Sequence, residues 1–305
     1  MDTEVLLMGG FLQKRERKQE NLEGLRIGNV NVNQKYFRPS HLPALNYQVS
    51  STFFHPYYKV DVSEIQLPQY LTTSPEATII NYYSVLMEAA IFPEGKVGGC
   101  GTVGMATLPY PIAYHFLTES YQKKVNYNEF VHSFNNIAHI NLIKLQRIYS
   151  HSNSLKNWRY FIELETIEGS AKDVTYFAYY YGYITVLKET DGYKINNIVL
   201  HGEDFLCAAY HGWDHNAESV IEAKYGNWCK LVKTRYPTIQ SGYVKNIVFT
   251  GTDGFVYLFI FFELTNGTDI EVAQYRQNLN GSWTPIKLIP EKCVEDSISP
   301  SKKLK

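Results

Sequence analysis

Residues 158–200 read WRYFIELETIEGSAKDVTYFAYYYGYITVLKETDGYKINNIVL, and this stretch decides the fold. Over residues 158–165 apolar side chains alternate with charged ones, which indicates a β-strand with one solvated face. Residues 174–188 are aromatic on both faces, and Asp191 and Gly192 then supply a tight turn before residues 193–200. The stretch therefore predicts three strands, the last two joined as a hairpin, in an antiparallel sheet.

A helix is predicted upstream of this sheet. Ser74 is a good N-cap, Pro75 is tolerated at the first helical position, and Glu76 favours the positive end of the helix, which runs to about residue 90. Two shorter helices and a further strand follow, over residues 110–117, from residue 126, and over residues 139–149. Together these patterns predict an α+β fold in which three helices pack on a curved antiparallel sheet.

After residue 200 the order repeats in a shorter form. A helix is predicted over residues 216–232, and four strands follow over 244–250, 255–264, 270–277 and 282–289. The string FIEL at 161–164 is matched by FFEL at 261–264. The predicted organisation is an extended N-terminal arm (1–73), a first domain (74–200), a junction (201–215), a second smaller α+β domain (216–290) and a disordered tail (291–305).

The first domain resembles the nuclear transport factor 2-like family. Residues 114–118 (YHFLT) and 127–130 (YNEF) look like the second and third helices of that family. The resemblance implies a cone, with one long and two short helices against a bent sheet, and residues 216–289 resemble a shortened second copy without the short helices. Tandem copies of this kind are similar to those in conjugation-channel and cell-envelope proteins of bacteria.

Composition excludes several classes of partner. The chain has 305 residues with 29 Lys and Arg against 30 Asp and Glu, so no net field favours nucleic acid or an anionic membrane. No apolar stretch approaches the roughly 20 residues of a membrane helix, so the chain as given is expected to be cytoplasmic. Residues 5–12 are apolar and precede a basic run, which would fit the end of an anchor lying upstream of Met1; the protein would then belong to the cell envelope.

Two motifs resemble known ligand-binding patterns, one for a dinucleotide and one for zinc. Residues 99–104 (GCGTVG) satisfy the dinucleotide pattern, but a helix precedes them and Pro109 follows, so a loop over the mouth of the cone is expected instead. Cys207, His211 and His215 could bind zinc. The alternative is that residues 201–215 only connect the two domains, because Gly212 breaks the helix that an HxxxH site requires. We favour the connection, and we expect no cofactor.

The spacing of the four cysteines also argues against a metal site. Cys100, Cys207, Cys229 and Cys293 are widely spaced and contain no CxxC pair. We interpret them as reduced, buried thiols.

Aromatic side chains supply the candidate binding site. Tyr is enriched in binding surfaces because it combines a large contact area with a hydrogen-bonding tip. The candidate ligand-binding residues are Trp158, Tyr176, Tyr179, Tyr181 and Tyr183. The alternative is that a strand buried on both faces needs such residues for packing alone.

These patterns predict a non-enzymatic binding or assembly module, which engages a protein partner or a small apolar ligand through a cone cavity or the Tyr-rich sheet. No nucleophile motif or triad order is present, and no catalytic residue is assigned. The alternative is a metal-dependent or acid-base enzyme. It would use the cluster at 201–218, or His139, Glu163 and Tyr179 inside the first cone.

Overall fold

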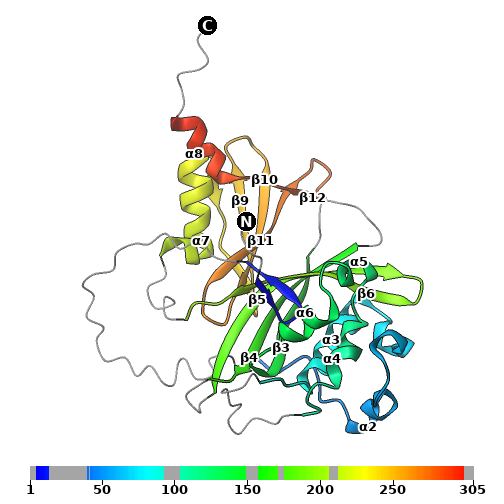
Figure 1. The fold of residues 1–305 in the computed structure, drawn as a ribbon. Helices are drawn as coiled ribbons and strands as arrows, with labels where there is room; N and C mark the ends of the chain where they lie inside the picture. Colours follow the sequence, from blue (N-terminus) through cyan, green and yellow to red (C-terminus); the bar gives the residue numbers. More distant parts are fainter. Residues whose placement is uncertain are drawn as a thin grey trace, which may run out of the picture. The chain divides into compact units, whose positions relative to one another are not determined.

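The computed structural model describes residues 5–13, 40, 42–92, 104–148, 157–170, 175–205 and 212–298. The chain divides into two compact units (Figure 1). The first unit contains Met1–Arg147 and Ser154–Glu203, and the second contains Ile148–Asn153 and Asp204–Lys305. The described residues form two six-stranded sheets with helices, which confirms the predicted α+β class.

The sheet of the first unit has the order β1-β2-β6-β5-β4-β3. Its four long strands are β3 (Ile137–Ile148), β4 (Asn157–Glu168), β5 (Tyr176–Glu189) and β6 (Gly192–Gly202). Strands β4, β5 and β6 pair antiparallel, and Gly192 makes the predicted tight turn between β5 and β6 with a φ of +137°. The hairpin expected at the end of the deciding stretch is therefore present.

The N-terminal region is part of the first unit. The sequence predicts an extended arm over residues 1–73, but β1 (Val5–Leu7) and β2 (Gly10–Leu12) form a hairpin whose second strand pairs parallel with β6. Gly9 has a φ of +72°, and a Cβ there would lie 2.7 Å from the Tyr82 hydroxyl, so only glycine fits. Residues 51–72 contribute four short helices, namely α2 (Ser51–Phe54), η1 (His55–Tyr57), η2 (Val62–Glu64) and η3 (Gln69–Thr72).

The sequence pattern does not predict these N-terminal elements. They are attached to the core by isolated apolar residues, which show neither the helical nor the strand period. Met8, Phe54, Ile65 and Leu71 are all buried in the core of the first unit. Single anchors of this kind carry no periodic signal in the sequence.

The predicted helices are present, and local capping explains where they begin. The side chain of Ser74 accepts a hydrogen bond of 3.0 Å from Ala77 N and starts α3 (Pro75–Met87). Asn126 and Glu129 form a capping box at α6 (Tyr127–His132). Between them lie α4 (Pro109–Tyr114) and α5 (Glu119–Gln122).

The helices pack on one face of the first sheet (Figure 1). Aromatic side chains fill the space between the helices and the sheet. Tyr82 of α3 contacts Phe116 with ring centroids 6.0 Å apart, and Phe130 contacts Phe134 at 5.0 Å. From β4 this core receives Tyr160, Ile162 and Leu164. Since alternate residues of a strand point to opposite faces, Phe161, Glu163 and Glu165 lie on the face away from the helices.

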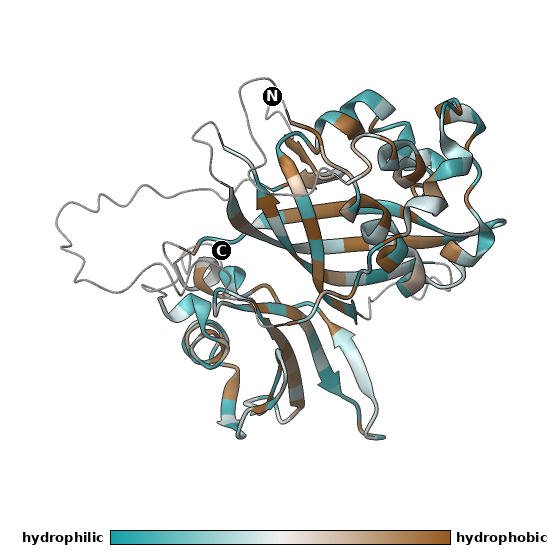
Figure 2. Ribbon diagram, turned by 90° about the horizontal axis from the view of Figure 1, so that it is seen from below, coloured by the Kyte–Doolittle hydropathy of each residue, from teal (hydrophilic) through white to brown (hydrophobic). Residues whose placement is uncertain are grey.

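The second unit has a sheet of order β12-β11-β10-β9-β7, with β8 paired to β9. Its strands are β7 (Val232–Arg235), β8 (Ile239–Ser241), β9 (Val244–Gly251), β10 (Val256–Glu263), β11 (Asp269–Gln277) and β12 (Trp283–Ile286). The helix predicted over 216–232 forms as α7 (Ala217–Val220) and a π-helix, η6 (Ile221–Trp228), and the short η5 (Trp213–His215) precedes it. The core of the second unit includes Ile221, Tyr225, Phe249 and Phe259. Apolar residues lie along the strands of both sheets (Figure 2).

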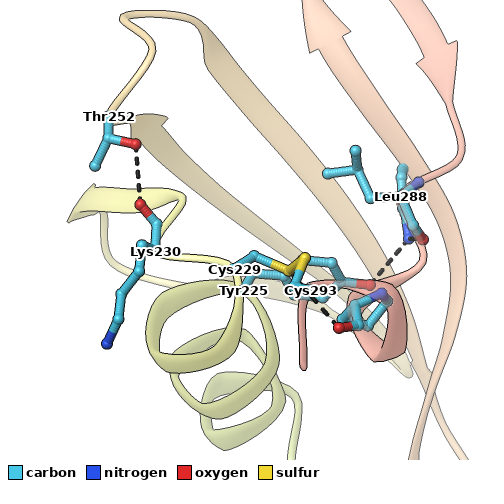
Figure 3. The surroundings of a disulfide bond; sticks show 8 residues. Tyr225, Cys229, Lys230, Thr252, Leu288 and Cys293 are labelled. Atoms are coloured by element: carbon cyan, nitrogen blue, oxygen red, sulfur yellow. Dashed lines mark hydrogen bonds between the residues drawn. A yellow bond between two sulfur atoms is a disulfide. The ribbon is translucent and has the colours of Figure 1, made fainter. Parts of the chain in front are cut away.

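The C-terminal segment corrects two expectations. Residues 290–298 form α8 (Pro290–Ile298), where we expected the disordered tail to begin at 291; residues 299–305 lie outside the described part. Cys293 of α8 is joined to Cys229 by a disulfide, with Cα atoms 5.0 Å apart (Figure 3). The interpretation of these two cysteines as reduced thiols was therefore wrong, because the fold brings together residues that are 64 positions apart. Spacing alone cannot reveal such a pair.

None of the helices in the described parts of the chain combines the length and the apolar character needed to cross a bilayer.

Candidate functional site

Three of the candidate tyrosines form a ladder on the sheet face opposite the helices of the first unit. Tyr179, Tyr181 and Tyr183 are alternate residues of β5, so they point to the same side. The register places Tyr179 opposite Glu165, Tyr181 opposite Glu163 and Tyr183 opposite Phe161 of β4. We call this set of residues, together with His201 and Arg159, the tyrosine face.

Aromatic contacts hold the tyrosine face together. The Tyr181 ring stacks on His201 of β6, with centroids 4.9 Å apart and an interplanar angle of 14°. Phe161 stacks on Tyr181 at 6.3 Å and meets Tyr183 edge-on at 6.0 Å. The guanidinium of Arg159 lies 4.1 Å from the centre of the Tyr183 ring, within the range of a cation–π contact. The result is a continuous aromatic cluster across β4, β5 and β6, in which Phe161 and Tyr181 are buried and Tyr183 and His201 are half-buried.

One end of this face is polar. Glu165 accepts hydrogen bonds from the Tyr179 hydroxyl at 2.8 Å and from Asn141 Nδ2 at 3.0 Å. His139 Nε2 lies 2.9 Å from Asn141 Oδ1, which extends the chain of contacts along β3. Polar partners on the same face fix the orientation of the Tyr179 ring, so the ladder is rigid at this end.

The other two candidate residues lie on the helix side of the sheet. Tyr176 donates a hydrogen bond of 3.0 Å to Glu168, which also accepts one of 2.7 Å from Tyr180. Burial beside the Glu168 carboxylate raises the pKa of Tyr180 above its usual value, so both phenols act as donors to this carboxylate. Trp158 packs against Tyr193 with ring centroids 5.1 Å apart. The five predicted residues thus divide between two faces.

The acid-base candidates lie on the tyrosine face, whereas the sequence placed them inside the cone. Glu163 shares its face of β4 with Arg159, but it pairs with Lys144 at 2.5 Å, and both of these side chains are buried. Arg159 instead packs on Tyr183. Charge pairs across a sheet depend on which strand lies alongside, and the partner here comes from β3.

The proposed zinc ligands fall largely outside the described residues. Cys207 and His211 are not among them, and neither are residues 99–103 of the glycine-rich loop. His215 Nδ1 lies 3.1 Å from the Thr268 hydroxyl, and its Nε2 lies 3.6 Å from Asp214. Where the structure describes the chain, no three His, Cys, Asp or Glu side chains are grouped so that they could hold a metal ion. The metal-dependent alternative stays a prediction.

Sequence reasoning missed Phe161, His201 and Arg159 as members of the tyrosine face. Phe161 breaks the alternation of β4, and an apolar residue on the expected solvated face was the available signal. His201 could not be found in this way, because its position opposite Tyr181 depends on the register of β6.

Comparison with known proteins gives little further information. No family model matches the chain, and no curated protein matches it. A solved structure titled "Ntf2 like protein involved in plasmid conjugation" is similar, with 9% identity, a TM-score of 0.20, and coverage of 55% of this chain and 87% of that one. A TM-score this low carries no argument, so the function proposed below depends on the geometry of this chain.

Proposed function

We propose that the chain is a non-enzymatic binding or assembly module whose tyrosine face engages a protein partner. The observation that carries this proposal is the end of the tyrosine face, where the exposed Arg159 packs on the half-buried Tyr183, while Tyr179 and Tyr181 are buried. The space between the helices and the sheet is filled by large aromatic side chains. Binding of a small apolar ligand inside the cone is therefore not part of the proposal.

The solvated end of the tyrosine face is the part that meets the partner. Arg159 is exposed and Tyr183 is half-buried, and the register places Tyr183 opposite Val199 and Thr185 opposite Asn197. Tyr and Arg are enriched at protein interfaces because each combines apolar contact area with directed hydrogen bonds. An exposed arginine packed on a half-buried tyrosine ring fits the surface of a folded protein.

The disulfide supports the cell-envelope alternative for localisation. Disulfides persist in oxidising compartments and are rare in the cytosol, where thiol reductants keep cysteines reduced. We therefore propose that the protein works in the cell envelope or outside the cell. Mass spectrometry of the protein from its native host checks this: a Cys229–Cys293 cross-linked peptide supports the proposal, and two free thiols at these positions contradict it.

A photocrosslinking experiment tests the proposed interface. The photoreactive residue p-benzoylphenylalanine replaces Tyr183 in one variant and Tyr176 in a matched control; Tyr176 is 46% exposed and lies on the opposite face of the same strand. Irradiation in the native host should give a discrete adduct from position 183 and none from position 176. Excess wild-type protein should compete the adduct away, and an Arg159→Ala/Tyr183→Ser variant should compete poorly.

Two results would contradict the proposal. One is the absence of any adduct from position 183. The other is equal competition by the wild type and the double variant. An adduct with the mass of two copies of this chain would show that the module assembles with itself.

A further inference from the structure

A second surface of the first unit has the form of a ligand site. A groove of about 530 Å³ lies between η3 and the end of the β5–β6 hairpin. Its volume is within the range of small-ligand sites. The groove is on a different part of the first unit from the tyrosine face, and none of the candidate residues predicted from the sequence lines it.

A close backbone approach builds this groove. Gly192 turns the chain between β5 and β6, and a Cβ there would lie 2.3 Å from the Thr72 hydroxyl. The hairpin therefore packs directly against η3. Any residue larger than glycine at position 192 would prevent this contact. Leu71 is buried in the core, and its carbonyl accepts a hydrogen bond of 2.8 Å from Asn81 Nδ2, so η3 is fixed from below.

Two tyrosine rings form the apolar part of the groove. Tyr70 of η3 is 62% exposed, although a large aromatic side chain usually buries most of its surface. Tyr193 of β6 is held by Trp158, at 5.1 Å between ring centroids, and has the Lys188 ammonium 5.8 Å from its ring centre. One ring is thus rigid and the other is open to solvent.

The polar side chains of the groove have unused hydrogen-bonding capacity. Within the described residues, Gln69, Thr73, Glu189 and Thr190 make no side-chain hydrogen bond to another part of the protein. The amide and the hydroxyls can each donate and accept, and the carboxylate accepts. A ligand rich in groups that both donate and accept would satisfy them.

The charge of the groove lining limits which class of ligand the groove can bind. The groove contains one cation, Lys188, and one anion, Glu189, so its lining is neutral overall. The neighbouring Asp191 and Lys194 are 3.4 Å apart and compensate each other. Such a lining does not select a phosphate or a nucleic acid, which require a surplus of positive charge.

We propose that this groove binds a neutral oligosaccharide. A pyranose ring has a flat face of C–H groups, which suits the electron-rich face of Tyr70 or Tyr193, and a rim of hydroxyls, which suits Gln69, Thr73 and Glu189. The match between ligand and groove is therefore apolar in the middle and polar at the edge.

Calorimetric titration of the purified, oxidised full-length chain tests the proposal. The probes are three neutral hexasaccharides: maltohexaose, cellohexaose and chitohexaose. At least one should bind with a Kd below about 1 mM. Tyr70→Ala should weaken that binding at least tenfold. The matched control is Tyr58→Ala, because Tyr58 is 66% exposed in the same region of the chain and does not line the groove.

Both tyrosines are on the surface, so the two variants should melt at the temperature of the wild type. Failure of all three sugars to bind below 1 mM would overturn the proposal. So would an equal loss of binding in Tyr58→Ala and Tyr70→Ala. A proline-rich peptide is the other ligand that aromatic grooves accept; binding of such a peptide without binding of any sugar would also overturn it.

Discussion

His115 lies directly after α4, and its side chain is half-buried. The folded structure disfavours protonation of its imidazole. Its Nε2 lies 2.6 Å from the carbonyl oxygen of Val62, and its own carbonyl accepts a hydrogen bond of 2.7 Å from Lys194 Nζ. Burial lowers the pKa of His115 below its ordinary value of 6.5, and the positive charge of Lys194 lowers it further, while the contact with Val62 acts in the opposite direction. The unfolded chain therefore binds this proton more readily than the folded one.

The sign of the resulting pH dependence follows from that difference. A group with a lowered folded pKa contributes stability that is present above its unfolded pKa, here about 6.5, and is lost as the pH falls through the folded value. We expect urea unfolding of the first unit to shift to lower urea between pH 7.5 and pH 5. His115→Gln keeps a donor for Val62 but does not titrate, so its shift should be smaller.

Trp158 fluorescence is the measurement, in a background where the other tryptophans, at 213, 228 and 283, are replaced by Phe. An identical acid shift in His115→Gln and its parent would show that other groups control this pH dependence.

At the scale of elements, α8 is joined to η6 of the second unit by a covalent bond. Its Glu291 pairs with Lys224 of η6 at 3.3 Å, but the Glu291 side chain is exposed and Lys224 is only half-buried, so this pair contributes little. The disulfide instead closes a loop between residues 229 and 293 and removes conformational freedom from the unfolded chain. Figure 3 shows the bond between the end of η6 and α8, beside Tyr225.

Replacing both cysteines by serine tests the contribution of this bond. We expect Cys229→Ser/Cys293→Ser to lower the free energy of unfolding of the second unit by about 2–4 kcal/mol, measured by urea unfolding. The matched control is the wild type in the presence of a reducing agent, which breaks the same bond and should lower the free energy of unfolding by a similar amount. Equal stability of the double variant and the oxidised wild type would contradict the assignment.

At the scale of the whole molecule, the two units have separate cores. The buried cluster of the first unit includes residues from Met8 to Leu200, and that of the second includes residues from Ala217 to Phe261. Only the second cluster belongs to the unit that carries the disulfide. Each core should therefore unfold as a cooperative unit of its own.

Scanning calorimetry of the full-length chain checks this expectation. Two transitions should appear, and a reducing agent should lower one of them by at least about 10 °C while leaving the other in place. The cysteine double variant should reproduce the shifted transition without reductant. A single transition that moves as a whole would show that the two units unfold together.

Local patterns predicted most of the elements correctly. The expected helix at 75–90 forms as Pro75–Met87, and the four strands expected after residue 240 form within three residues of their predicted ends. These elements have caps, turns or an alternating period, all of which are short-range signals. The β1–β2 hairpin and η3 have no such signal, because they are held by long-range contacts with β6 and α3.

The amino-acid sequence alone determined most of the strands and helices, the α+β class, and the presence of a tyrosine-rich strand, because caps, turns and periods act over a few residues. Tertiary structure decided that Tyr179, Tyr181 and Tyr183 share a face with Phe161 and His201, that Cys229 meets Cys293, and that Gly192 meets Thr72 to form a groove. These contacts depend on strand register and on how distant segments pack, and a shift of one residue in register would turn each side chain to the opposite face.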